Sequence, residues 1–175
     1  ERVMEECLAI KPDLIFLWDE AWFAFARFGP TYRQRTGMNA ANTLRERFRS
    51  DKHAKAYAAQ QAKLKDADDA TLLKTRLIPP PTARVRVYTT QSTHKTLTSL
   101  RQGSMIHVND QDFKGEVEQS FHEAYMTHTS TSPNYQIIAS LDVGRRQVEL
   151  EGFEFVQRQV EAAMSMRRAI STHPL

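Results

Sequence analysis

Apolar residues recur along the chain at two spacings, one typical of strands and the other typical of helices. Residues 14–18 (Leu-Ile-Phe-Leu-Trp) are an unbroken apolar run, which predicts a strand buried on both faces within a parallel sheet. Residues 84–88 alternate with period two and predict a second strand, and residues 104–108 are a third candidate. Residues 1–10 place their apolar side chains at helical spacing.

Further helical patterns separate these strands. Residues 20–27, 113–127, 134–150 and 152–170 are each predicted to be helical from composition and spacing. Residues 39–83 combine alanines with charged side chains, which predicts one or two exposed helices, ended by three consecutive prolines. Strands that alternate with helices predict an α/β fold.

The composition supports a folded core and argues against several classes of protein. With 41% hydrophobic and 26% charged residues, the 175-residue chain can bury a core. The net charge of +3 is too small to indicate a nucleic-acid partner. No apolar stretch reaches about 18 residues, so we expect no membrane span. The single cysteine, Cys7, and the lack of a secretion signal favour a cytoplasmic protein.

A lysine follows the predicted strand at residues 84–88. Lys95 ends the polar string Ser92-Thr93-His94-Lys95, and a rigid strand end that opens to a ligand cleft suits a lysine that attacks a carbonyl carbon. A surface lysine after a polar loop has the same pattern. The residues alone favour the surface lysine.

A carboxylate follows the apolar run. Asp19 either caps a helix at residues 20–27 or holds a cationic group of a ligand, because ligands gather at the carboxyl ends of strands in open α/β sheets. The residues alone favour the cap. The six histidines and Cys7 lack the spacing of a metal site, and no phosphate-binding glycine motif or serine-hydrolase elbow is present.

Four strings of residues, in order, resemble the bacterial ornithine/lysine/arginine decarboxylases. They span residues 19–22, 90–95, 103–108 and 122–135. The resemblance implies a pyridoxal-phosphate enzyme and the aspartate-aminotransferase-like fold, called fold type I. In that case residues 1–175 are a segment of the cofactor-binding large domain, with a mostly parallel sheet and flanking helices. The resemblance does not distinguish lysine, ornithine and arginine as the substrate.

The resemblance also implies roles for individual residues. Lys95 would hold pyridoxal 5'-phosphate as a Schiff base and return a proton after decarboxylation, and Asp19 would face the pyridine nitrogen. Ala21 would pack beside the cofactor ring, with Trp22 nearby. These residues occupy the string at 19–22 and the end of the string at 90–95.

Three further residues would act on the cofactor phosphate. Ser92 and His94 would contact it within the same chain, and His94 is counted with Lys95 and Asp19 among the catalytic residues. Ser130, in a threonine- and serine-rich turn, would reach the phosphate of a neighbouring subunit. The resemblance therefore implies a homodimer or a higher oligomer.

Two departures from the family pattern complete these expectations. The residues that cradle the phosphate and stack on the ring would lie before Glu1, so we expect a segment that is inactive alone and needs the remainder of its large domain as a partner. Residues 39–83 look like a helical insertion, which we expect to be a surface excursion replaceable by a short linker. The alternatives are a non-catalytic decarboxylase-like segment and another fold-type-I reaction on an amino acid.

Overall fold

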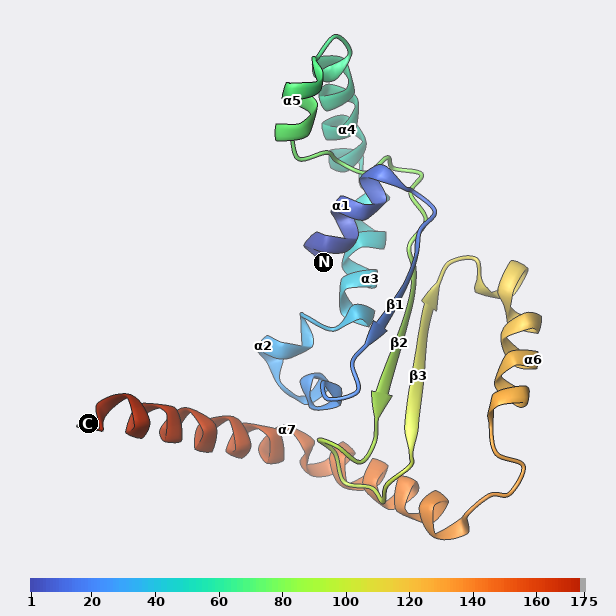
Figure 1. Cartoon of the computed structure of the whole chain (residues 1–175), viewed down its shortest axis with the longest axis vertical. Coiled ribbons are helices and arrows are strands. Elements are labelled where there is room, and N and C mark those ends of the chain that lie inside the picture. The colour runs from blue at the N-terminus through green and yellow to red at the C-terminus, as the bar shows by residue number, and fades with distance from the viewer. Residues whose placement is uncertain (174–175) are drawn as a thin grey trace. The chain divides into compact units, whose positions relative to one another are not determined.

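The computed structural model describes residues 1–173, which contain helices and three strands (Figure 1). Two of the helices are short departures from the α-helix: η1 is a 3-10 helix and η2 is a π-helix. In chain order the elements are α1 (Arg2–Ile10), β1 (Ile15–Asp19), η1 (Ala24–Phe28), α2 (Pro30–Arg33), α3 (Gly37–Phe48), α4 (Asp51–Leu64), α5 (Asp69–Lys74), β2 (Arg86–Ser92), β3 (Ser104–Asp110), η2 (Phe113–Val117), α6 (Glu118–His128) and α7 (Tyr135–Thr172).

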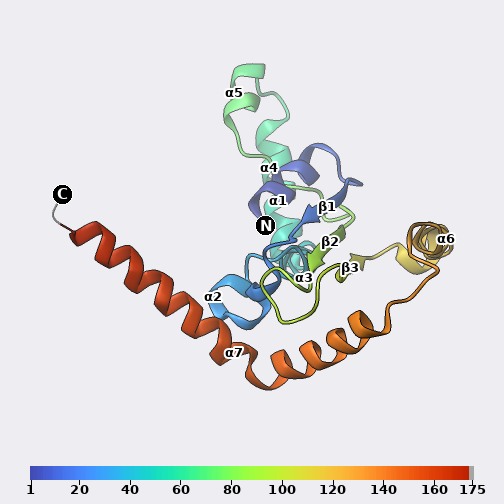
Figure 2. The ribbon, with the colours of Figure 1, turned by 60° about the horizontal axis from the view of Figure 1, so that its bottom comes forward.

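The three strands form one mixed sheet in the order β1-β2-β3, with β2 in the middle in both views of the ribbon (Figures 1 and 2). β1 and β2 run in the same direction, whereas β3 runs opposite to β2 (Figure 1). The expectation of a mostly parallel sheet is therefore only partly correct. Helices connect β1 to β2, as a parallel crossover requires, but residues 93–103 contain no helix and let the chain return antiparallel.

The apolar run of β1 is not buried on both faces, so that expectation is wrong. Phe16 packs in the core, while its neighbour Leu17 is 70% exposed. β1 lies at an edge of the sheet, and no element within residues 1–173 covers its outer face. A continuous apolar run requires two covering layers, and the described part of the chain supplies one.

The chain divides into two compact units, and every strand passes from one unit to the other. The first unit comprises residues 1–18, 37–89 and 106–129, and the second comprises residues 19–36, 90–105 and everything from Ser130 onward. The first unit contains the main hydrophobic core, which joins α1, β1, α3 and β2. Its buried members are Met4, Leu8, Phe16, Ala40, Ala41, Leu44, Phe48, Ala83, Val85 and Val87.

Residues 39–83 are helical, as expected, but they are not a surface excursion. α3 contributes several buried side chains to the core of the first unit, among them Leu44 and Phe48. Beyond α3 the segment is mostly exposed, but His53, Pro79 and Ala83 are buried. The His53 ring lies against Phe48 at a centroid distance of 4.9 Å, and its Nε2 donates to the Pro79 carbonyl at 2.9 Å. Replacing residues 41–82 by a linker would therefore remove part of the core.

Leu44 provides a direct test of the role of α3. Leu44→Ala is expected to lower the free energy of unfolding by about 2–5 kcal/mol, because the side chain is 0% exposed and its removal leaves a cavity. Leu73→Ala is the matched control, because Leu73 lies in the same segment on α5 but is 88% exposed. Denaturant unfolding of the two variants measures the difference. Equal, small losses would contradict the assignment of α3 to the core.

A buried polar cluster links β2 to β3 within the first unit. Tyr88 donates a hydrogen bond to Asp110 Oδ2 at 2.8 Å, and Arg86 Nε lies 3.3 Å from the same oxygen. Burial, followed by the hydrogen bond to Asp110, raises the pKa of Tyr88 to about 12. The phenol therefore stays protonated and continues to donate, which holds the two antiparallel strands in register.

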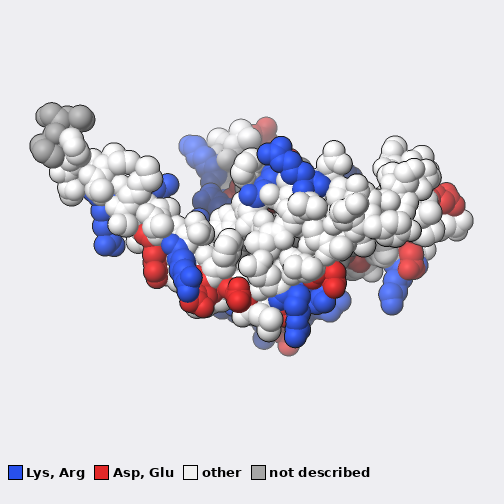
Figure 3. Space-filling model, turned by 90° about the horizontal axis from the view of Figure 1, so that it is seen from below, with Lys and Arg blue, Asp and Glu red and all other residues white. Residues whose placement is uncertain are grey.

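α7 dominates the second unit, and the expected break before Gly152 is absent, since one helix runs from Tyr135 to Thr172. Gly152 serves close packing here, because a Cβ at this position would overlap the ring of Phe28. Charged side chains gather along one side of α7, while much of the remaining surface in that view is uncharged (Figure 3). Exposed i,i+3 and i,i+4 ion pairs within the helix account for part of that charged side.

Candidate functional site

Asp19 is the last residue of β1, and it forms a tight turn instead of capping a helix. Its Oδ1 accepts a hydrogen bond from the Ala21 backbone N–H at 3.0 Å. The next helix, η1, begins at Ala24 and has Phe23 as its N-cap residue, so the expected helix at residues 20–27 is shorter and starts later. Asp19 is exposed, and within residues 1–173 its second oxygen, Oδ2, accepts no hydrogen bond.

The ends of β1 and β2 lie side by side. The Glu20 N–H donates to the Thr90 carbonyl at 2.9 Å, and the Ser92 N–H donates to the Ala21 carbonyl at 3.3 Å. β2 continues to Ser92 and so includes residues that the sequence placed in a polar loop. Because both strands end at the same edge of the sheet, the turns that carry Asp19 and Lys95 leave the sheet together.

Lys95 lies three residues beyond β2 and is exposed. Its Nζ lies 5.2 Å from the centroid of the Trp22 ring, which places the ammonium group over an aromatic face. Trp22 follows directly on the Asp19 turn. The structure thus brings the strings at residues 19–22 and 90–95 into contact.

The His94 ring is held by the backbone. Its Nδ1 lies 3.1 Å from the Gly103 carbonyl oxygen, which also accepts the Thr93 N–H at 3.2 Å. Because a carbonyl only accepts, Nδ1 carries the proton, and Nε2 is the nitrogen left for a ligand. Gly103 makes this arrangement possible, since a Cβ there would overlap Thr93 Oγ1. Ser92 is buried.

Ser130 lies in an exposed turn before α7. Its Oγ accepts a hydrogen bond from the Ser132 N–H at 3.1 Å. The N-cap of α7 is Asn134, whose side chain accepts from the Ile137 N–H at 3.1 Å. Neither Ser130 nor Ser132 therefore caps α7.

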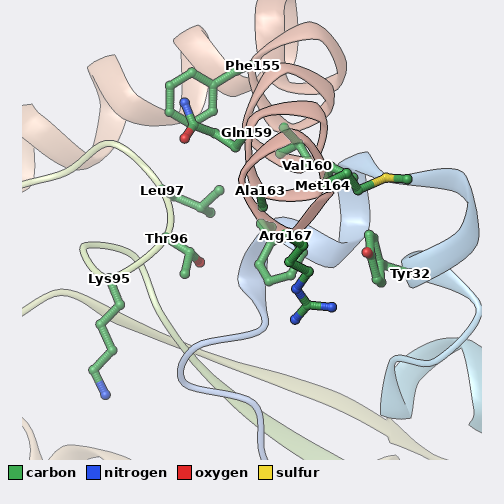
Figure 4. A pocket seen from close by; sticks show the side chains of 12 residues that line it. Tyr32, Lys95, Thr96, Leu97, Phe155, Gln159, Val160, Ala163, Met164 and Arg167 are labelled. Carbon is green, nitrogen blue, oxygen red and sulfur yellow. The ribbon is translucent and has the colours of Figure 1, made fainter. Parts of the chain in front are cut away.

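A cleft of about 560 Å³ lies in the second unit between the loop after β2 and the C-terminal half of α7 (Figure 4). Aliphatic and aromatic side chains line most of it, and Arg167 and Gln159 add polar groups from α7. Thr96 and Leu97 come from the loop, and the Lys95 side chain extends away from the α7 wall (Figure 4). The cleft therefore adjoins the lysine without enclosing its amine.

The residues at the strand ends fit part of a pyridoxal-phosphate site. They supply an exposed primary amine, an exposed carboxylate with one unpaired oxygen, and an imidazole with a free ring nitrogen, from Lys95, Asp19 and His94. Within residues 1–173, no cluster of His, Cys, Asp and Glu is arranged to hold a metal ion. No helix in this described part combines the length and the apolar character needed to cross a bilayer.

The sequence analysis missed one buried pair at this site. Gln91 donates from Nε2 to Glu20 Oε2 at 2.9 Å, next to both candidate turns. Glu20 adjoins Asp19 and resembles an ordinary polar residue after a strand, and Gln91 resembles part of a loop. Only the burial of both side chains marks them as a pair, and this burial cannot be recognised from the local sequence.

The structure is that of an α/β segment with a mixed three-stranded sheet, and comparisons with known proteins identify its family. Residues 80–174 match the family model described as "Orn/Lys/Arg decarboxylase, major domain". The chain belongs to this family of decarboxylases.

Individual relatives agree with the family. The lysine decarboxylase LdcA of Pseudomonas aeruginosa is 33% identical over 155 residues, and the biodegradative arginine decarboxylase of Escherichia coli is 30% identical over 156 residues. Each alignment covers 88% of this chain and 16% of the relative. The crystal structure of the lysine decarboxylase LdcF from Francisella novicida aligns with a TM-score of 0.57 and 25% identity, over 91% of this chain and 17% of that one. The chain thus spans about a sixth of its relatives.

Proposed function

We propose that this chain is the part of a pyridoxal-phosphate-dependent decarboxylase that carries the cofactor lysine, Lys95. The substrate is lysine, ornithine or arginine, and the products are the corresponding amine and carbon dioxide. Relatives that act on lysine and on arginine match this chain at 33% and 30% identity over the same share of its length, so identity does not favour one substrate.

One observation carries the proposal. The backbone bonds from Glu20 to Thr90 and from Ser92 to Ala21 bring the Asp19 turn beside the strand that leads to Lys95. A carboxylate and a primary amine at adjoining parallel strand ends are the two groups that this cofactor needs, one for its ring nitrogen and one for its aldehyde carbon.

Each residue then has a defined task. Pyridoxal phosphate, when bound, supplies an electron sink for the electron pair left when carbon dioxide departs. The Asp19 carboxylate holds a proton on the ring nitrogen, because a nearby negative charge favours the cationic form. The Lys95 amine would hold the cofactor and would supply the proton that the α-carbon of the product takes up. Ser92 and His94 Nε2 bind the phosphate group, while Trp22 and Ala21 border the ring.

The rest of the large domain is the partner that completes this site. Large apolar side chains are exposed on α7 and, in the other unit, on β1, and exposed apolar surface of this kind is available to a covering partner. Residues that cradle the phosphate and stack on the ring come from the part of the enzyme outside this chain, so the chain is inactive alone. The exposed apolar side chains include Leu17, Leu150, Phe153, Met166 and Ile170.

The full-length enzyme that contains this chain tests the proposal. Borohydride reduction traps the link between the cofactor aldehyde and the lysine amine, and peptide mapping then locates it. The adduct is expected on Lys95. An adduct on another lysine, or a protein that retains no cofactor at all, would overturn the assignment and favour a non-catalytic, decarboxylase-like protein.

Ser130 is expected to act in the site of a neighbouring subunit. Its hydroxyl is exposed and does not cap α7, which leaves it available to a phosphate group of another chain. Subunits with Lys95→Ala and subunits with Ser130→Trp are each expected to be inactive. Mixing them should restore about a quarter of normal turnover, since half of the dimers are mixed and each mixed dimer has one intact site. If folded, exchanging subunits restore nothing, Ser130 does not act in trans.

A further inference from the structure

A buried carboxylate and a buried amide form a hydrogen bond where β1 and β2 end, next to the candidate site. Glu20 and Gln91 are each 9% exposed, and Gln91 Nε2 donates to Glu20 Oε2 at 2.9 Å. Neither residue has a role in the proposed function. Their position 71 residues apart in the sequence means that the contact exists only when β1 and β2 are correctly paired.

The pair sits between the residues that the proposed function uses. Glu20 directly follows Asp19, and Gln91 lies four residues before Lys95. The backbone bonds from the Glu20 N–H to the Thr90 carbonyl and from the Ser92 N–H to the Ala21 carbonyl lie beside this pair, just beyond the end of β1. A shift of one residue between β1 and β2 would break the side-chain bond and both backbone bonds together.

Burial makes this pair selective for one register. A carboxylate removed from water is costly unless it accepts hydrogen bonds, and an unpaired buried amide is costly as well. An apolar pair at the same rung would tolerate a slip, whereas a directional bond to a charged acceptor does not. The contact therefore penalises every pairing of β1 and β2 in which Asp19 and Lys95 are displaced from each other.

We propose that Glu20 and Gln91 are positioning residues that set the register of Asp19 relative to Lys95. The effect on cofactor binding rests on the proposed function. The fixed register of the two strand ends does not depend on a cofactor. One measurement therefore tests the register and a second tests cofactor binding.

Four variants of the full-length enzyme test the inference. Glu20→Ala removes the acceptor, and Glu20→Gln keeps the shape but removes the charge. The double variant Glu20→Gln with Gln91→Glu restores a donor and a charged acceptor with their places exchanged. Glu161→Ala is the matched control, since Gln157 donates to Glu161 at the same 2.9 Å on α7, but on the exposed surface.

The first measurement is hydrogen exchange of the Glu20 and Ser92 backbone amides in the cofactor-free protein. Glu20→Ala is expected to speed exchange at both amides by about 10-fold or more, and the exchanged double variant is expected to restore their protection. Glu161→Ala should leave both rates unchanged. Unchanged protection in Glu20→Ala would overturn the register role whether or not Lys95 carries a cofactor.

The second measurement is the absorbance spectrum of the bound cofactor and its change with pH, together with the cofactor dissociation constant. Glu20→Ala is expected to weaken cofactor binding at least about 10-fold and to shift the pH dependence of the spectrum, and the double variant is expected to recover both. Loss of thermal stability with a normal spectrum would show a merely structural pair and overturn the positioning role. If Glu20→Ala does not fold, failure of the folded double variant to recover binding overturns it instead.

Discussion

Lys95→Ala in the full-length decarboxylase is expected to lower kcat by about 10²–10⁴-fold, the range that a positioned proton-transfer group contributes. The loss has two sources, since the variant has no amine to attach the cofactor and none to return a proton to the product. Neither task has a substitute among the neighbours of Lys95 at the end of β2, where the preceding residues are a buried serine, a buried threonine and a histidine bonded to Gly103. Steady-state turnover measures the effect.

Lys95→Arg separates the chemistry of the lysine from its charge. The guanidinium can remain over the Trp22 ring, where Lys95 Nζ lies 5.2 Å from the centroid. Arginine does not deprotonate in proteins, so it can neither attach the cofactor nor transfer a proton. We expect Lys95→Arg to match Lys95→Ala in turnover while retaining normal thermal stability. A small primary amine added to the solution should restore part of the activity of the alanine variant only. Substantial turnover in Lys95→Arg would contradict the role of the amine.

Asp19→Asn is expected to lower turnover by about 10–150-fold, which corresponds to roughly 1.5–3 kcal/mol for a hydrogen bond to a charged group. The carboxylate stabilises the protonated ring nitrogen through its charge, and a neutral amide does not. Asparagine keeps a carbonyl oxygen that can accept from the Ala21 N–H, so the turn that Asp19 forms at 3.0 Å should persist. The measurement is turnover combined with the cofactor absorbance spectrum.

Asp19→Ala is the companion variant, because it removes the turn as well as the charge. If Asp19 only stabilises its turn, the asparagine variant has near-normal turnover and the alanine variant alone is impaired. If the charge acts on the ring, both variants lose turnover to a similar extent, and only Asp19→Ala also loses stability. The first pattern would refute the proposed electrostatic role.

The family resemblance, and not the local pattern, singled out Asp19 and Lys95, since the residues alone favoured a helix cap and a surface lysine. The strings with Asp19 and Lys95 do meet at adjoining strand ends, as the family resemblance implies. The boundaries were less accurate: β2 extends to Ser92, beyond the alternating stretch, because its polar residues pair with β1 and β3 in the sheet. Periodicity reports which side chains share a face, but backbone pairing decides where a strand ends.

Packing decided two features that composition misjudged. Residues 39–83 looked like exposed helices because alanines and charges dominate them, yet Leu44 and Phe48 of α3 lie in the main core. Residues 134–150 and 152–170 were predicted as separate helices, yet one helix, α7, runs through both, and at Gly152 the absence of a Cβ admits the ring of Phe28. In both cases the residue types are compatible with an exposed or a packed position, and contacts with other segments decide between the two.

The sequence by itself determined the family resemblance and the alternation of strands and helices, because both depend on residue types and their spacing along the chain. Only the tertiary structure decided the antiparallel direction of β3, the exposed outer face of β1 and the buried bond between Glu20 and Gln91. These features arise where segments far apart in the chain meet. Burial and hydrogen bonding at such contacts depend on the side chains of the other segment, which a local sequence pattern does not include.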